Sequence, residues 1–136
     1  MASFNMSEAD IERFMRQDFV VTGSDGSAGH PRKYGTFPTK IRVYSLDRGV
    51  IPFSRAIAAS SARTADIVGL VTGPDEPGRF ADIVVLDPGG HAPRSTYEAP
   101  ELLATGVRFV VVNGRLAVDG GRILPVLAGR ALRPGS

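Results

Sequence analysis

The stretch GVRFVVVNGRLAVDGGRIL, residues 106–124, carries the clearest fold signal in the chain. Asn113-Gly114 separates two runs of apolar and β-branched residues, and Asn-Gly is typical of the type I′ turn of a β-hairpin. Gly120-Gly121 predicts a second reversal of the chain into a third, short strand. This stretch therefore predicts antiparallel β structure.

A further β-branched run, RFADIVVLD at residues 79–87, precedes the hairpin and predicts another strand. Upstream of residue 71 the apolar residues instead follow a helical spacing. We therefore divide the chain into residues 1–70 and residues 71–136. The second part is predicted to be a small antiparallel β unit with a loosely ordered tail.

Helical patterns dominate the first part of the chain. Residues 6–17 present one apolar face, and Ser7 is placed to cap this helix. Further helices are predicted over residues 37–46 and from Phe53 onward, and Thr64 is predicted to cap one more turn. These helices flank a short apolar run and give the first part the character of an α/β unit.

That apolar run is FVVTGS, residues 19–24, which is apolar on both faces. The pattern is typical of a strand in a parallel sheet, where both faces are covered. One such strand cannot form a sheet by itself. The chain is therefore predicted to be a piece of a larger fold, or to pair with another chain.

Composition excludes several function classes. The chain has 136 residues, the size of one ordinary domain, and no cysteine, which excludes disulfides and thiolate metal sites. Its arginines are scattered and its net charge is only +2, which disfavours nucleic-acid binding. No apolar run approaches the roughly 20 residues that a membrane span requires. With no signal peptide recognised, we expect a cytoplasmic protein with no membrane partner.

The stretch GSDGSAGHPR, residues 23–32, holds the residues best suited to chemistry. Asp25 directly follows the predicted strand, where α/β barrels carry catalytic groups, although Ser-Asp-Gly is also an ordinary turn. Arg32 follows a proline on the same loop and is suited either to clamping a carboxylate or to a structural role. His30 is more typical of a hydrogen-bonding residue than of a metal ligand, and His91 is predicted to lie on the surface.

Two motifs resemble a known family. SEADIERFMRQDFVVTGSDG, residues 7–26, followed by HPRKYGTF, residues 30–37, resembles the last barrel segment of the D-aminoacylases, the N-acyl-D-amino-acid deacylases of the amidohydrolase superfamily. GRFADIVVLDP, residues 78–88, and the hairpin stretch resemble segments common at the C-terminus of amidohydrolases. The resemblance is collinear and covers nearly the whole chain.

The resemblance implies a (β/α)₈, or TIM, barrel beside a small β-sandwich. It implies zinc-dependent hydrolysis of an N-acyl-D-amino acid to a carboxylate and a free D-amino acid. Asp25 would be the general base and a metal ligand in the complete enzyme. Arg32 would bind the substrate carboxylate, and His30 and Tyr34 would shape this substrate-binding loop.

The other metal ligands of the family lie on barrel strands that have no counterpart in this sequence. We therefore expect a C-terminal fragment, with residues 1–70 as the terminal barrel segment and residues 71–136 as part of the β-sandwich. Alone, the chain is expected to bind no zinc and to be inactive. Its expected partners are the small-molecule substrate, the missing barrel segment or another chain, and a second copy through exposed β edges. A non-catalytic interaction module, or another amidohydrolase of the dihydroorotase or hydantoinase kind, remains an alternative.

Overall fold

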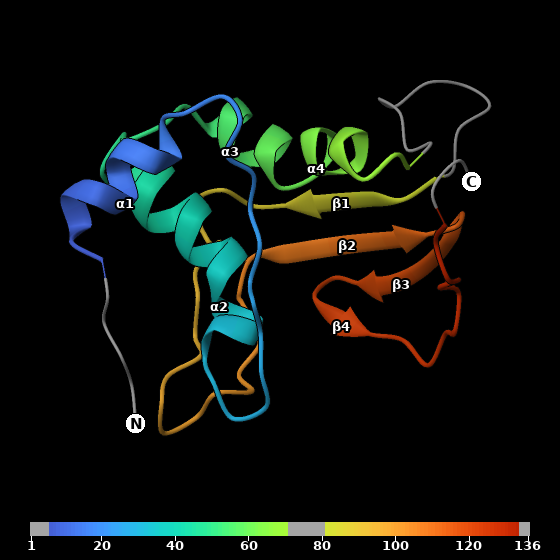
Figure 1. Ribbon diagram of the computed structural model, residues 1–136. Coiled ribbons are helices and arrows are strands. Elements are labelled where there is room, and N and C mark those ends of the chain that lie inside the picture. The colour runs from blue at the N-terminus through green and yellow to red at the C-terminus, as the bar shows by residue number, and fades with distance from the viewer. Residues whose placement is uncertain (1–5, 71–80, 134–136) are drawn as a thin grey trace.

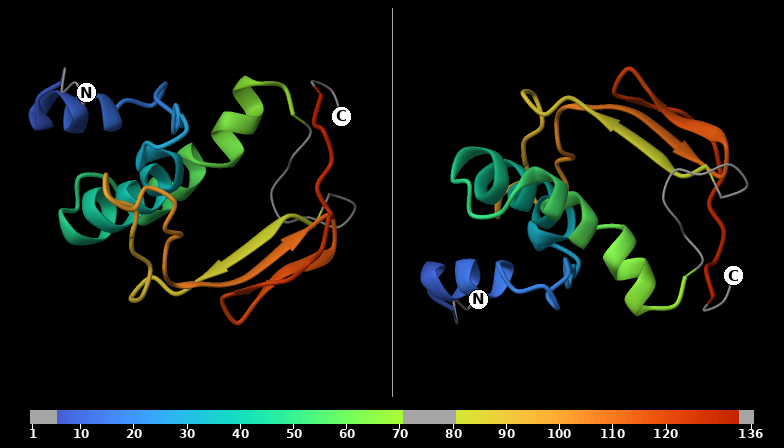
Figure 2. Two further views of the ribbon diagram at one scale, coloured as in Figure 1. Left: turned by 90° about the horizontal axis from the view of Figure 1, so that it is seen from below. Right: turned by 90° about the horizontal axis from the view of Figure 1, so that it is seen from above.

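The computed structural model describes residues 6–70 and 81–133. A helical part comes first and a β-sheet follows (Figure 1). The elements in chain order are α1 (Glu8–Met15), α2 (Arg32–Thr39), the π-helix η1 (Lys40–Asp47), α3 (Phe53–Ala59), α4 (Ala62–Ile67), β1 (Ile83–Leu86), β2 (Val107–Val112), β3 (Arg115–Asp119) and β4 (Arg122–Ile123). Figure 2 shows the sheet set apart from the helices, with the connection between β1 and β2 reaching back toward them.

The N-terminal helix forms where the sequence predicts it. Ser7 is its N-cap, and its hydroxyl oxygen accepts a hydrogen bond from the amide of Asp10 at 3.2 Å. The acidic residues of its first turn, Glu8 and Asp10, also suit the positive end of the helix dipole. The local signals of this segment therefore agree with its structure.

The helix predicted over residues 37–46 begins earlier and continues as a different helix type. Pro31 occupies the N-cap position with φ −61°, a value that suits the start of a helix. Pro38 lies inside α2 and has no amide to donate. The chain then continues as the π-helix, and the amide of Arg48 closes its end on the carbonyl of Val43 at 3.0 Å.

Residues 19–24 form no strand in the described part of the chain, although a covered parallel strand is predicted there. Phe19 is 76% exposed, so the prediction that both faces are covered is wrong for the described residues. The amide of Thr22 donates to the carbonyl of Ala59 on α3 at 2.9 Å instead of to a strand. A ladder needs a neighbouring strand, and residues 6–70 and 81–133 place none beside this segment.

Thr64 does not cap a helix, because α4 begins before it, at Ala62. Its hydroxyl donates to the carbonyl of Ala59 at 3.0 Å. A bond to the preceding helix thus replaces the predicted bond to an amide of its own turn. Gly69, with φ +69°, follows α4 in the left-handed conformation that commonly ends a helix.

In the described part of the chain, the sheet is antiparallel with four strands in the order β1-β2-β3-β4. Asn113 and Gly114 both have positive φ, 47° and 76°, as a type I′ turn requires. Gly120 and Gly121 also have positive φ, 55° and 85°, and lead into β4. The predicted hairpin and third strand are therefore confirmed.

The hydrophobic core lies among the helices and is small. Its buried side chains are Ile41, Val50, Ile51 and Ala56. On the sheet, by contrast, all four residues of β1 remain exposed or half-buried. No helix among the described residues is both long enough and apolar enough to cross a bilayer.

Candidate active site

The loop that follows residue 24 packs directly on the first turn of α2. Asp25 has φ 45°, in the left-handed region that aspartate tolerates better than most residues. Gly26 must be small, because a Cβ there would lie 2.8 Å from the Cα of Lys33. This close approach places the Asp25 carboxylate beside the beginning of α2.

Asp25 and Arg32 form an ion pair. The Nη2 atom of Arg32 lies 2.9 Å from Oδ2 of Asp25, and the two side chains are 42% and 89% exposed. A pair this exposed contributes little to folding, because water screens it. The structure thus brings together the acid and the guanidinium that the sequence singles out, at a position open to solvent.

The side chain of His30 holds the backbone of Arg32. Its Nδ1 atom accepts a hydrogen bond from the amide of Arg32 at 3.1 Å. This bond requires an unprotonated Nδ1, so the neutral ring carries its proton on Nε2. Tyr34 is less central: the Lys33 ammonium lies 5.4 Å from its ring centroid, and Tyr34 does not line the neighbouring cavity.

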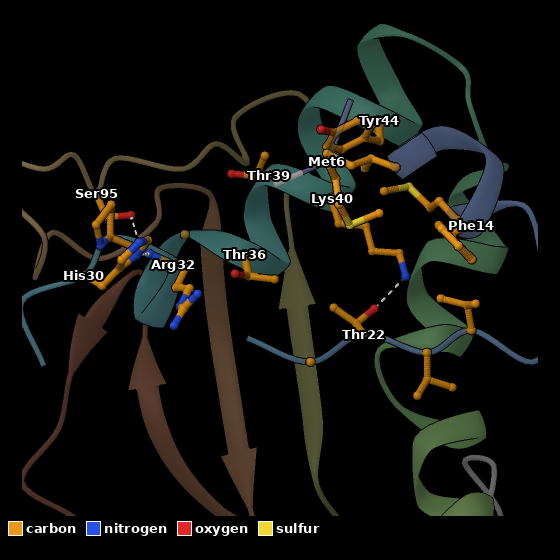
Figure 3. A pocket seen from close by; sticks show the side chains of 17 residues that line it. Met6, Phe14, Thr22, His30, Arg32, Thr36, Thr39, Lys40, Tyr44 and Ser95 are labelled. Carbon is orange, nitrogen blue, oxygen red and sulfur yellow. Dashed lines mark hydrogen bonds between the residues drawn. The ribbon is translucent and has the colours of Figure 1, made fainter. Parts of the chain in front are cut away.

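That cavity has a volume of about 670 Å³ and lies between α1, residues 20–23 and α2. Figure 3 shows His30 and Arg32 near Ser95 at one end, and Lys40 reaching toward Thr22 at the other. Apolar side chains of α1 also line the cavity, and Figure 3 shows one of them, Phe14, at the end where Lys40 lies. An apolar wall with a few convergent polar groups is typical of a ligand site.

Lys40 is a charged residue of the cavity for which the sequence predicts no role. It is only 7% exposed, and its Nζ atom donates to the hydroxyl of Thr22 at 2.6 Å. The Thr22 hydroxyl lies in turn 2.8 Å from that of Ser60. Burial, together with the positive charge of Arg55, lowers the pKa of Lys40 below its ordinary value. The only available signal was that Lys40 is one of two lysines in an arginine-rich chain.

His91 is buried, which corrects its assignment to the surface. It is 5% exposed, and its Nδ1 atom lies 2.9 Å from the carbonyl oxygen of Thr105. Gly106 allows this burial, because a Cβ at this position would overlap the backbone of His91. The isolated bridge between Ala92 and Thr105 holds the two chain segments together.

The described residues do not by themselves fit a zinc site. No group of three or more histidine, cysteine, aspartate or glutamate side chains converges within residues 6–70 and 81–133. A catalytic zinc site typically has three protein ligands. Within the described part of the chain, Asp25 pairs with Arg32, so a zinc ion at Asp25 would require further ligands from elsewhere.

The chain was compared with families and with individual proteins of known function. No protein-family model matches it. D-aminoacylase of Alcaligenes xylosoxydans xylosoxydans is 38% identical over 116 residues, which cover 82% of this chain and 24% of that protein. N-acyl-D-aspartate deacylase of the same organism is 32% identical, covering 97% of this chain and 28% of that protein.

Solved structures agree with this similarity in sequence. A crystal structure of D-aminoacylase matches 94% of this chain with a TM-score of 0.87 and 36% identity, over 28% of its own length. N-acyl-D-glutamate deacylase of Bordetella bronchiseptica, solved with zinc and a phosphonate mimic of the tetrahedral intermediate, matches 91% with a TM-score of 0.78 and 31% identity. The chain thus spans about a quarter of the length of these relatives. By sequence and by fold, it belongs to the D-aminoacylase family of N-acyl-D-amino-acid deacylases, a group of amidohydrolases.

Proposed function

We propose that this chain forms one wall of the active site of a zinc-dependent N-acyl-D-amino-acid deacylase. The observation that carries the proposal is the Asp25–Arg32 pair, held on the loop after residue 24 in a chain whose relatives are deacylases. Residues 1–70 would be the terminal segment of a (β/α)₈ barrel. Residues 71–136 would be part of the accompanying β-sandwich.

In this proposal Asp25 is the general base. Its carboxylate accepts a proton from the attacking water and passes it to the nitrogen of the scissile amide, which leaves as the amine of the D-amino acid. Water supplies the oxygen of the new carboxylate, so the reaction balances as hydrolysis. The zinc ion would polarise the amide carbonyl and lower the pKa of the water.

Arg32 would bind the α-carboxylate of the substrate. A guanidinium has five N–H donors in a planar fork and can hold a carboxylate through two bonds. In the ion pair with Asp25, the closest atoms are Nη2 of Arg32 and Oδ2 of Asp25, 2.9 Å apart. The substrate carboxylate would compete with Asp25 for the donors of the guanidinium.

The zinc ligands and the remainder of the barrel would come from polypeptide beyond the described residues. Two features support this. Residues 19–24 have no neighbouring strand in the described structure, and Phe14 of α1 is 52% exposed beside the cavity. Further barrel strands would cover this apolar surface. Without them Asp25 has no zinc-bound water to deprotonate, so the isolated chain would not hydrolyse amides.

An interaction module is the second candidate, and the sheet favours it. Val84 and Val85 of β1 are exposed, and β1 is an edge strand in the described sheet. Exposed apolar edge strands are ready to pair with another chain. In this reading the chain would bind a partner through β1 and carry out no chemistry.

A chimeric enzyme distinguishes the catalytic proposal from the interaction module. The quarter of the Alcaligenes D-aminoacylase that aligns with this chain is replaced by this chain, and hydrolysis of N-acyl-D-amino acids is measured with zinc. The same enzyme with that quarter deleted is the control. We expect zinc-dependent release of the D-amino acid from the chimera only. A folded, zinc-loaded chimera without turnover would rule out the catalytic proposal and leave the interaction module.

A further inference from the structure

The connection between β1 and β2, residues 87–106, leaves the sheet and returns to the beginning of α2 (Figure 1). Two of its side chains, Ser95 and Tyr97, contact the turn that carries Arg32. They follow Arg32 by more than 60 residues, and sequence reasoning gave them no role. The candidate site is thus supported from the β part of the chain.

Ser95 fixes the backbone at the start of α2. Its hydroxyl donates to the carbonyl oxygen of Pro31 at 2.9 Å, and the same oxygen accepts the amide of Gly35 at 2.8 Å. Gly35 makes room for this arrangement, because a Cβ there would lie 2.5 Å from the Ser95 hydroxyl oxygen. The Ser95 hydroxyl therefore fits into the first turn of α2.

Tyr97 fixes the ring of His30. The two rings meet edge to face, with their centroids 5.3 Å apart and an interplanar angle of 70°. This is a favourable geometry for an aromatic pair. The Nδ1 atom of the same ring accepts a hydrogen bond from the Arg32 amide. The imidazole is thus held between Tyr97 and the backbone of Arg32.

We propose that Ser95 and Tyr97 are positioning residues, which set the place and direction of Arg32 through Pro31 and His30. Arg32 is a long side chain with many rotamers, and the exposed ion pair to Asp25 restrains it only weakly. Because the backbone at Arg32 is held from two sides, fewer conformations are available to its guanidinium. This inference rests on the proposed function for the role of Arg32 in binding the substrate carboxylate. The contacts that Ser95 and Tyr97 make can be tested in this chain alone.

The first experiment is ¹⁵N NMR of the histidine rings in the 136-residue chain at alkaline pH, where imidazoles are neutral. The chain has only two histidines, so His30→Gln assigns the signals. We expect the His30 ring to be in the Nε2–H form. Tyr97→Leu should shift it toward a mixture of tautomers and speed the exchange of the Arg32 side-chain protons with solvent.

Tyr97→Phe is the matched control, because it keeps the ring edge and removes only the hydroxyl. It should preserve both signals. Tyr97 is 53% exposed, so neither substitution is expected to unfold the chain, and the thermal unfolding midpoint checks this. Unchanged His30 and Arg32 signals in Tyr97→Leu would overturn the proposal, whether or not the chain serves a deacylase.

The second experiment uses the chimera. Ser95→Ala with Tyr97→Leu should raise KM about tenfold for an N-acyl-D-amino acid with a free carboxylate, with a smaller change in kcat. KM for the matching carboxamide substrate should not change, because Arg32 has no carboxylate to bind there. An equal rise for both substrates would overturn the role of the two residues in carboxylate binding. A chimera inactive with Ser95 and Tyr97 in place would instead count against the proposed function, and the NMR result would stand.

Discussion

At the scale of single residues, Lys40 carries a charge at a buried position, where it has little contact with water. Its Nζ atom has the Thr22 hydroxyl as a hydrogen-bond acceptor, whereas an ammonium has three donors. No acidic side chain among the described residues forms an ion pair with it. Lys40 is therefore expected to weaken the isolated chain at neutral pH.

Lys40→Met tests this expectation. Because burial lowers the pKa of Lys40 in the folded state, the penalty is fully present at pH values below that folded pKa. It disappears as the pH rises through the folded pKa toward the unfolded value of 10.5. We expect Lys40→Met to raise the free energy of unfolding by about 1–2 kcal/mol at pH 7, and the gain to shrink at alkaline pH.

Urea unfolding across this pH range measures the effect. Lys33→Met is the control, because Lys33 is the only other lysine and is exposed. It should leave the free energy of unfolding nearly unchanged. A loss of stability in Lys40→Met at neutral pH would mean that the bond to Thr22 outweighs the cost of burying the charge.

The candidate residues that the sequence predicts are those that lie close together along the chain. Asp25, His30 and Arg32 fall within one short stretch, so motif and turn chemistry were enough to select them as candidates. Lys40 and Tyr97 were missed because tertiary folding brings them to the site, and no local pattern shows that.

At the scale of secondary-structure elements, ion pairs dock α1 on the rest of the helical part. The guanidinium of Arg48 lies 2.7 Å from the carboxylate of Glu8 and also contacts Glu12. Tyr44 donates its hydroxyl to Glu8 at 3.2 Å. The hydrogen bond from Arg48 holds the pKa of Glu8 below its ordinary value of 4.5.

Acid should therefore loosen α1. A lowered folded-state pKa contributes stability above the unfolded value of 4.5, and this contribution is lost as the pH falls through the folded pKa. We expect hydrogen exchange of the α1 amides, corrected for intrinsic rates, to accelerate below pH 4.5. Arg48→Met should remove this dependence, and Arg13→Met, at an exposed position of α1, should keep it. The same pH dependence in both variants would contradict the account.

Elements differed in how well the sequence predicts them. The β2–β3 hairpin is specified locally, because Asn113 and Gly114 accept the positive φ values that the turn needs. Residues 19–24 have the composition of a strand, but strand structure requires a partner, and the described residues provide none. Thr64 has the chemistry of a cap, but its hydroxyl donates to a carbonyl of the preceding helix instead of accepting from an amide of its own turn.

At the scale of the whole molecule, much apolar surface lies open. Val84 on the edge strand β1 is 58% exposed, Phe19 is 76% exposed, and Phe14 is exposed beside the cavity. The relatives are about four times longer than the part that aligns with this chain. We infer that these surfaces are covered in the complete protein.

The isolated chain should therefore associate with itself. We expect sedimentation velocity to show a concentration-dependent increase in mass, because edge strands and apolar faces pair with one another. Val84→Lys should shift this association to higher concentration. Val68→Lys, on the exposed residue after α4, is the control. Equal association of both variants would show that β1 is not the contact.

We propose that Asp25 acts as the general base of a deacylase that this chain helps to form. The direct test is kcat of the chimera with Asp25→Asn, because asparagine tolerates the positive φ of 45° but cannot accept the proton. Loss of a positioned general base typically costs about 10²- to 10⁴-fold in rate. We expect a loss of this size in a folded chimera. Turnover close to that of the chimera with Asp25 intact would contradict it.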